Sequence, residues 1–185
     1  MASVTFYTDA PWGPADDRWQ TTNRALKRLV DRHRADLQLT AEIGEKIRCA
    51  LESLFPIFDQ LCRSTCQWCP EPCCIVNKVW IDFQDLLFWH LIECTIPPGQ
   101  LKSTDLEPCR YLKHRGCMLP RLIRPWGCTQ YVCRTQQKRL LENNPAQEVY
   151  VDQTIQAIRL ARFDMEASFV DIVLCDRHQC AVDAH

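Results

Sequence analysis

Residues 62–74, with the sequence CRSTCQWCPEPCC, place five cysteines within thirteen residues, two of them adjacent. Gaps of two or three residues between cysteines let successive thiolates converge on one ion or one cluster, because the chain turns once between them. The side chains of adjacent residues diverge. Cys73 and Cys74 therefore either bind two different metals, or one of the two is not a metal ligand. The spacing favours a metal site.

The chain has 185 residues and 13 cysteines, which is also compatible with a disulfide framework. Its first residues, MASVTFYTDAPWGP, have neither the basic nor the apolar segment of a secretory signal, so we expect a cytoplasmic protein with reduced thiols. The cysteine count is odd, and a chain of this length can stabilise a core without disulfides. Disulfides are therefore the less favoured alternative.

Composition excludes several classes of partner. The formal net charge is −1, so the total charge does not attract nucleic acid or an anionic lipid surface. No apolar run reaches about 18 residues, so we expect no membrane span. Apolar residues make up 46% and charged residues 24%, the mixture of a globular protein, and we expect a single domain over residues 1–185.

Apolar periodicity predicts a mainly α fold with little or no β structure, a helical bundle that brackets an irregular cysteine-rich segment. We expect an irregular arm over residues 1–16 and helices over 17–61. The cysteine-rich metal-binding core spans 62–134, and a C-terminal helix spans 145–174.

Several residues mark expected boundaries. Thr40 is a plausible N-cap of the second helix, and Pro56 should bend or break that helix. Val79 to Ile81 is expected to be extended, and Asp82 with Asp85 three residues later predicts a capped helix.

The second half of the predicted site is CRYLKHRGCMLPRLIRPWGC, residues 109–128, which combines three cysteines with five basic residues and no acidic one. The basic residues are Arg110, Lys113, Arg115, Arg121 and Arg124. Nearby cations stabilise thiolates by lowering their pKa. A solvated basic loop or a phosphate-binding patch is the alternative, and the flanking cysteines favour the first interpretation.

The order of these motifs resembles the YkgJ-type cysteine-cluster family, described as a zinc- or iron-chelating domain. Its pattern is C-x2-C-x2-C-C, an apolar stretch with an acidic residue, a cysteine before a hydrophobic pair, and a cysteine shortly before R-P-x2-C. This chain has one extra residue before Cys73-Cys74 and lacks the family's tyrosine after Cys117. The resemblance implies that the matching cysteines are metal ligands: Cys66, Cys69, Cys73, Cys74, Cys109, Cys117 and Cys128.

The first cysteine block is also similar to that of bacterial flagellin lysine N-methylases, which implies an iron–sulfur cluster. Many sulfurs without a convincing histidine favour the same cofactor. We expect a cluster of the [4Fe–4S] type, with Zn²⁺ as the alternative. Trp68 and Trp126 would shield it from water, unless they are simply core residues. Arg124 would donate hydrogen bonds to sulfur, unless it only braces the loop against a carboxylate.

Other candidate residues have simpler interpretations. His90 is expected in a core or interface, His114 in an exposed loop and His178 near the terminus. Cys49 and Cys94 are expected to be core thiols outside the site.

The spacing Cys62-x3-Cys66-x2-Cys69 is also that of the radical-SAM signature. That chemistry resides in a β/α barrel, and the scarcity of predicted strands disfavours it.

Two classes of function remain open. The first is a redox, electron-transfer or accessory module that holds the cluster for a protein partner of unknown identity, with a zinc-stabilised adaptor as a variant. The second is an enzyme that uses the cluster in methyl transfer or redox chemistry. The sequence contains no Gly-rich phosphate loop, nucleophile elbow or HExxH motif, so the module is favoured and enzyme status stays open.

Overall fold

The computed structural model describes residues 16–76, 79–102, 107–113 and 116–182. Over these residues the chain is mainly helical, as the sequence predicts, and its strands form one short hairpin. No helix in this part of the chain is long and apolar enough to cross a membrane. The predicted N-terminal arm, apart from its last residue, and His114 lie outside the described residues.

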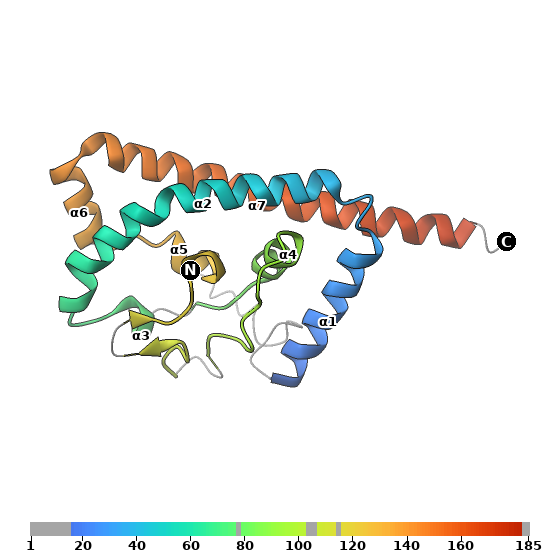
Figure 1. Cartoon of the computed structure of the whole chain (residues 1–185), viewed down its shortest axis with the longest axis horizontal. Coiled ribbons are helices and arrows are strands. Elements are labelled where there is room, and N and C mark those ends of the chain that lie inside the picture. The colour runs from blue at the N-terminus through green and yellow to red at the C-terminus, as the bar shows by residue number, and fades with distance from the viewer. Residues whose placement is uncertain (1–15, 77–78, 103–106, 114–115, 183–185) are drawn as a thin grey trace, which may run out of the picture.

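Two long helices, α2 (Gln38–Thr65) and α7 (Pro145–Val182), run side by side over much of their length (Figure 1). At one end α6 (Arg134–Asn143) leads into α7, and at the other α1 (Asp16–Arg32) precedes α2. The shorter helix α4 (Phe83–Leu91) packs against α1, α2 and α7. These helices form the bundle that brackets the cysteine-rich segment.

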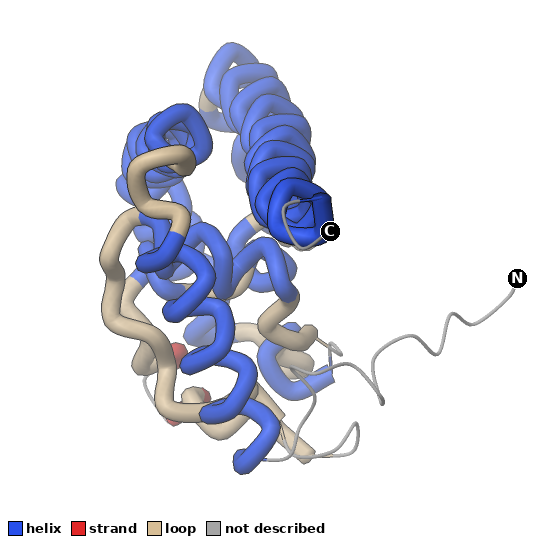
Figure 2. The backbone as a smooth tube through the Cα atoms, turned by 90° about the vertical axis from the view of Figure 1, so that its right-hand side faces the viewer, coloured by secondary structure: helices blue, strands red, loops and turns tan. Residues whose placement is uncertain are grey.

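The cysteine-rich segment contains only short elements. A 3-10 turn covers Cys66–Trp68, and α3 (Cys73–Val76) follows it. Strand β1 (Leu112–Lys113) pairs antiparallel with β2 (Gly116–Cys117), and α5 (Trp126–Thr129) completes the segment. The side view shows the hairpin and connecting loops below the long helices (Figure 2). This agrees with the predicted loop-rich core and not with a β/α barrel.

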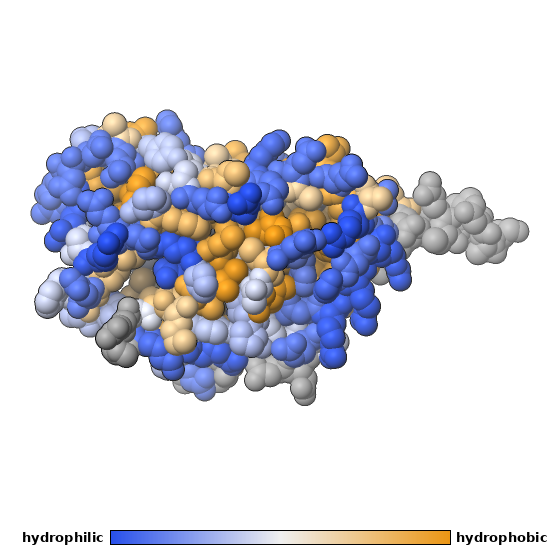
Figure 3. All heavy atoms as spheres, viewed as in Figure 1, coloured by the Kyte–Doolittle hydropathy of each residue, from blue (hydrophilic) through white to orange (hydrophobic). Residues whose placement is uncertain are grey.

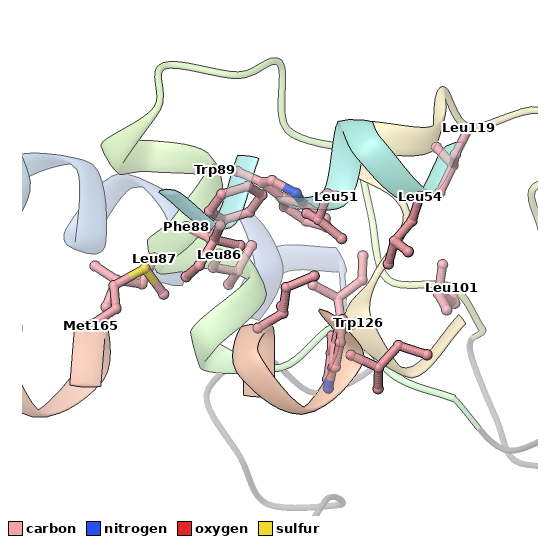
Figure 4. Packing of buried hydrophobic residues seen from close by; sticks show 14 of the residues in the cluster. Leu51, Leu54, Leu86, Leu87, Phe88, Trp89, Leu101, Leu119, Trp126 and Met165 are labelled. Atoms are coloured by element: carbon pink, nitrogen blue, oxygen red, sulfur yellow. The ribbon is translucent and has the colours of Figure 1, made fainter. Parts of the chain in front are cut away.

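The hydrophobic core attaches these loops to the helices. Leu54 of α2, Leu86 of α4 and Met165 of α7 are fully buried, and the loop residues Leu101 and Leu119 extend the same cluster (Figure 4). Burying one such side chain stabilises the fold by about 1.5–3 kcal/mol. Apolar residues also show in the middle of the face below α2, surrounded by hydrophilic ones (Figure 3).

The side chain of the buried Gln100, and not a paired strand, binds the backbone of the segment that leads into α4. The segment Val79–Ile81, expected to be extended, belongs to neither strand of the described hairpin. Instead, the Ile81 N–H donates to Gln100 Oε1 at 2.7 Å, and Gln100 Nε2 donates to the Ile81 carbonyl at 2.9 Å. The Arg110 N–H in turn donates to the Leu101 carbonyl at 2.8 Å. These bonds fix the chain entering α4 to the loop that carries Cys109.

The N-terminus of α4 is as predicted. The Asp82 side chain accepts from the Asp85 N–H at 2.8 Å, and the Asp85 side chain accepts from the Asp82 N–H at 3.2 Å. This reciprocal pair satisfies two backbone donors at the start of the helix.

The structure differs from the predicted helices in three places. Helix α2 begins two residues before Thr40, which is fully buried inside the helix and bonded to Ser168 Oγ at 2.7 Å. Pro56 does not end α2, because Leu54 and Phe58 bind both sides of it to the core and outweigh the lost backbone hydrogen bond. Helix α6 was not expected, because only Gln136 and Leu140 are buried along it.

Candidate metal centre

One cavity of about 130 Å³ gathers cysteines from distant parts of the sequence. Its walls come from the end of α2, from α3, from the hairpin region and from α5. The cysteines that line it are Cys62, Cys66, Cys73, Cys74, Cys109, Cys117 and Cys128. A metal centre with thiolate ligands needs this convergence of soft sulfur donors.

The end of α2 supplies the first two thiols. Cys62 and Cys66 are four residues apart, so they share one face of the helix at its C-terminus. Burial raises the pKa of Cys66 to about 11, and the nearby Cys62 adds to this shift. Cys66 keeps accessible surface because it lines the cavity, while the surrounding protein disfavours its charged form.

The adjacent pair in α3 is asymmetric. The Cys74 thiol donates a hydrogen bond to Cys73, which lowers the pKa of Cys73 and raises that of Cys74. Burial raises the pKa of Cys74 further, and the Arg124 guanidinium opposes this. The hydrogen bond therefore favours the charged form of Cys73 over that of Cys74.

Cys109, which precedes the hairpin, and Cys117, the last residue of β2, both line the cavity. Cys117 pairs with Leu112 in the β1–β2 register, and Gly116 takes a φ of 103°, which favours glycine. Burial raises the pKa of Cys109, and Cys117 and Cys74 add smaller contributions. The two thiols are thus close enough to interact across the short hairpin.

Cys128 is held by the most buried anchor of the site. The Trp126 N–H, at the start of α5, donates to Asp85 Oδ1 at 2.9 Å. Gly127 packs so closely that a Cβ there would lie 2.8 Å from Val79 Cγ1. Burial raises the pKa of Cys128, with Cys74, Cys109 and Cys117 contributing. Cys128 therefore belongs with the hairpin thiols and Cys74.

Three basic side chains line the same cavity: Lys102, Arg121 and Arg124. Lys102 is only 3% exposed. Arg124 Nε donates to the Leu119 carbonyl at 2.9 Å, so its contact with the loop is to the backbone and not to the carboxylate that one interpretation expected. Positive charges beside these thiols stabilise negative charge in the cavity. A metal ion bound by four thiolates would carry such a charge.

The structure does not bring every predicted site residue to the cavity. Cys69 is exposed and does not line it, and Trp68 is 79% exposed on the same turn. Trp126 is buried beside Arg162 and lines a neighbouring small cavity together with Arg124. Neither tryptophan lies in the wall of the cysteine cavity.

Cys62 and Gln136 line the cavity although the sequence analysis did not include them among the site residues. Cys62 lines the cavity, and Gln136 of α6 reaches it with its side-chain amide. The one-turn spacing of Cys62 and Cys66 was visible in the sequence, whereas the role of Gln136 depends on the unpredicted helix α6. Cys49 and Cys94 lie outside the cavity wall, as expected, but Cys49 is exposed and not a core thiol.

The twelve cysteines whose side chains the structure describes are free thiols, and none of these forms a disulfide. Among the described residues, no group of three or more histidine, cysteine, aspartate or glutamate side chains is arranged closely enough to hold one metal ion. The cysteines share one cavity and the soft sulfur chemistry of a thiolate centre, but not its close spacing. Ligation would require their sulfurs to be drawn together.

Comparisons of the chain with protein-family models, with curated proteins and with solved structures found no match. The resemblance of the cysteine pattern to the YkgJ-type family therefore stays a prediction.

Proposed function

We propose that this chain is a metal-binding redox or accessory module in which Cys74, Cys109, Cys117 and Cys128 hold an iron–sulfur cluster. The observation that carries the proposal is the convergence of these four thiols, from segments up to 54 positions apart, on one cavity. Their mutual electrostatic interaction groups them as one set of ligands.

The size of the cavity favours a cluster over a single ion. A water-sized group needs about 10–15 Å³ by the same measure of volume, so a space of about 130 Å³ is far larger than one cation requires. A four-iron cluster held by four cysteines is a larger group that uses such a space. Apolar side chains in the wall, including Leu101 and Leu119, would limit access of water to it.

The charges around the cavity support the same ligand. Four thiolates and a cluster carry net negative charge, and the buried Lys102 with Arg124 would offset it. When bound, the cluster would supply one-electron transfer. The chain's own residues would position its ligands and exclude water, and a protein partner would exchange the electron.

The test is chemical analysis of the full chain purified without oxygen. We expect a brown protein with about four irons and four acid-labile sulfides per chain, the content of a four-iron cluster. Cys128→Ser should lose most of the iron and sulfide. The matched control is Cys49→Ser, which changes an exposed thiol outside the cavity and should keep both.

Three results would contradict the proposal. A colourless protein that holds zinc without sulfide would support the adaptor interpretation instead. A protein without metal would rule out both. Equal loss of iron in Cys128→Ser and Cys49→Ser would show that the cavity does not define the ligands.

A further inference from the structure

The outward face of α7 carries a stripe of exposed apolar side chains. Its members recur at steps of three and four residues: Leu160, Phe163, Ala167, Val170 and Leu174. Leu160 is 65% exposed and Phe163 is 58% exposed. A helix that packs on a core with one face ordinarily presents polar residues to solvent on the other face, so this stripe is an exception.

The stripe lies opposite the face by which α7 joins the core. Met165 and Phe169 are buried on that inner face. At 3.6 residues per turn, Leu160 and Phe163 lie on roughly the opposite side of the helix. Helices α2 and α4 pack against α7 and leave the stripe exposed. The stripe therefore faces away from the elements that hold α7 in the fold.

The spacing of the stripe is that of a helix that pairs with another helix. Alternating steps of three and four residues form a 3.5-residue repeat, which places apolar side chains at the a and d positions of a coiled coil. At about 1.5 Å per residue, the stripe from Leu160 to Leu174 is about 21 Å long. The last turns of α7 extend beyond the other helices, so a partner can lie along them (Figure 1). The stripe thus fits the apolar face of one partner helix.

The residues beside the stripe decide which helix fits it. Asp164 and Asp171 are exposed along one edge, and the half-buried Glu166 lies along the other. The basic residue at these flanking positions is Arg159, which donates to Gln130 Oε1 at 3.1 Å. Over residues 159–173 the flanks therefore carry three acidic side chains and one basic side chain. Flanking charges of this kind set the choice of partner in coiled coils.

We propose that this stripe is a docking surface for a basic amphipathic helix of another protein. Apolar side chains of the partner pack on Leu160 and Phe163, and its lysines or arginines pair with Asp164 and Asp171. A second copy of this chain would bring the same acidic excess to the contact, and like charges facing each other disfavour that pairing. The acidic flanks disfavour an anionic lipid surface for the same reason.

The experiment titrates the full-length chain with two synthetic peptides and measures binding by fluorescence anisotropy. Both peptides have about three heptads with leucine at the a and d positions, and their e and g positions carry lysine in one and glutamate in the other. The lysine peptide should bind roughly tenfold more tightly, because the glutamate peptide replaces each attraction with a repulsion of similar size.

Two single substitutions test whether the stripe is the binding surface. Phe163→Glu places a charge in the apolar contact and should weaken binding of the lysine peptide by about tenfold or more. Leu141→Glu is the matched control, because Leu141 is an apolar residue of α6 that is 48% exposed and lies outside the stripe. It should leave the affinity unchanged. Circular dichroism establishes that both variants keep the helical content of the original chain.

A charge reversal tests the choice of partner separately from the apolar contact. Asp164→Lys/Asp171→Lys keeps the apolar stripe and changes the sign of one edge. This variant should bind the glutamate peptide more tightly than the lysine peptide, which is the reverse of the original chain. A surface that is merely apolar would show no such reversal.

Four results would overturn the proposal. Neither peptide binds, both bind equally well, or the charge-reversed variant keeps the original preference. In the fourth, Phe163→Glu binds the lysine peptide as tightly as Leu141→Glu. Sedimentation of the chain alone adds a further check, since a dimer that Phe163→Glu dissociates would make a second copy the occupant and refute the basic partner. None of these measurements depends on metal in the cavity, so they stand apart from the proposed cluster.

Discussion

Arg162 of α7 donates from Nη1 to Oδ1 of Asp85 at 2.9 Å, and both side chains are at most 4% exposed. The same oxygen accepts from the Trp126 N–H, so one carboxylate connects α7, α4 and α5. Arg162 also donates to Asp82 and lies 5.6 Å from the Trp126 ring. This buried network lies directly behind the segment that carries Cys128, and it fixes that wall of the cavity to the long helices.

Removing the arginine should be strongly destabilising. Arg162→Met leaves Asp85 buried without its cation, and breaking a buried pair from one side costs about 3–5 kcal/mol in free energy of unfolding. Denaturation by urea measures this difference. Arg34→Met is the control, because its ion pair with Glu93 is exposed to solvent and should contribute far less to the free energy of unfolding. Similar losses in the two variants would show that the buried network does not stabilise the fold.

The hydrogen bond between two hydroxyl groups, Thr40 and Ser168, should contribute less to the free energy of unfolding than the Arg162–Asp85 pair. Thr40 and Ser168 join α2 to α7 by a hydrogen bond of 2.7 Å, and Thr40 is fully buried. Thr40→Val keeps the shape of the side chain but removes the bond, so we expect a loss of about 0.5–1.5 kcal/mol in the free energy of unfolding. In the background of Ser168→Ala the same change should cost less, and an unchanged cost in that double-mutant cycle would show that the two hydroxyls do not interact.

His90 should make the protein less stable in mild acid. Burial lowers its pKa to about 4 from the ordinary 6.5, and Nε2 has no hydrogen-bond partner among the described residues. Between pH 6.5 and about 4 the unfolded chain therefore binds a proton at His90 that the folded chain does not bind. The contribution of neutral His90 to the free energy of unfolding is complete above pH 6.5 and is lost as the pH falls toward 4.

The comparison of the original chain with His90→Leu isolates this effect. Asp85 has the opposite influence, because burial raises its pKa to about 7, but it is present in both proteins. Urea midpoints measured at about pH 8 and pH 5 should show a larger advantage of the variant at the lower pH. An advantage that is the same at both values would mean that His90 is protonated equally in the folded and unfolded states.

The helices were predictable because their signals are local. The sequence predicts an inner face of α7 made of Val151, Ile155, Ile158, Met165, Phe169 and Ile172, and all of them are buried except Ile172, which is partly buried. The capped start of α4 follows from two aspartates three residues apart. Arg162 was not predicted on this inner face, because a charged residue there is explained only by carboxylates 77 and 80 positions earlier in the chain.

The site was predictable only as a set of segments. The family resemblance selects Cys69 and omits Cys62, yet α2 continues through Cys62 and directs it to the cavity, while Cys69 follows a turn that leaves it exposed. Gln136 shows the same limit, since no motif connects it to cysteines 70 positions away. Local patterns identify which residues can bind metal, and tertiary packing decides which of them meet.

Gly127 packs closely against Val79, and this contact helps to set the position of the next residue, Cys128. A Cβ at this position would lie 2.8 Å from Val79 Cγ1, which is closer than carbon atoms approach in folded proteins. Because valine has a stiff side chain, Gly127→Ala must displace Val79 or α5 and should cost about 1–3 kcal/mol in free energy of unfolding. Adding Val79→Ala removes the clashing methyl group, so the second change should cost less in the Gly127→Ala background than in the original chain. Thermal or urea unfolding of the four proteins measures this coupling, and strictly additive losses would show that α5 accommodates the extra atom without meeting Val79.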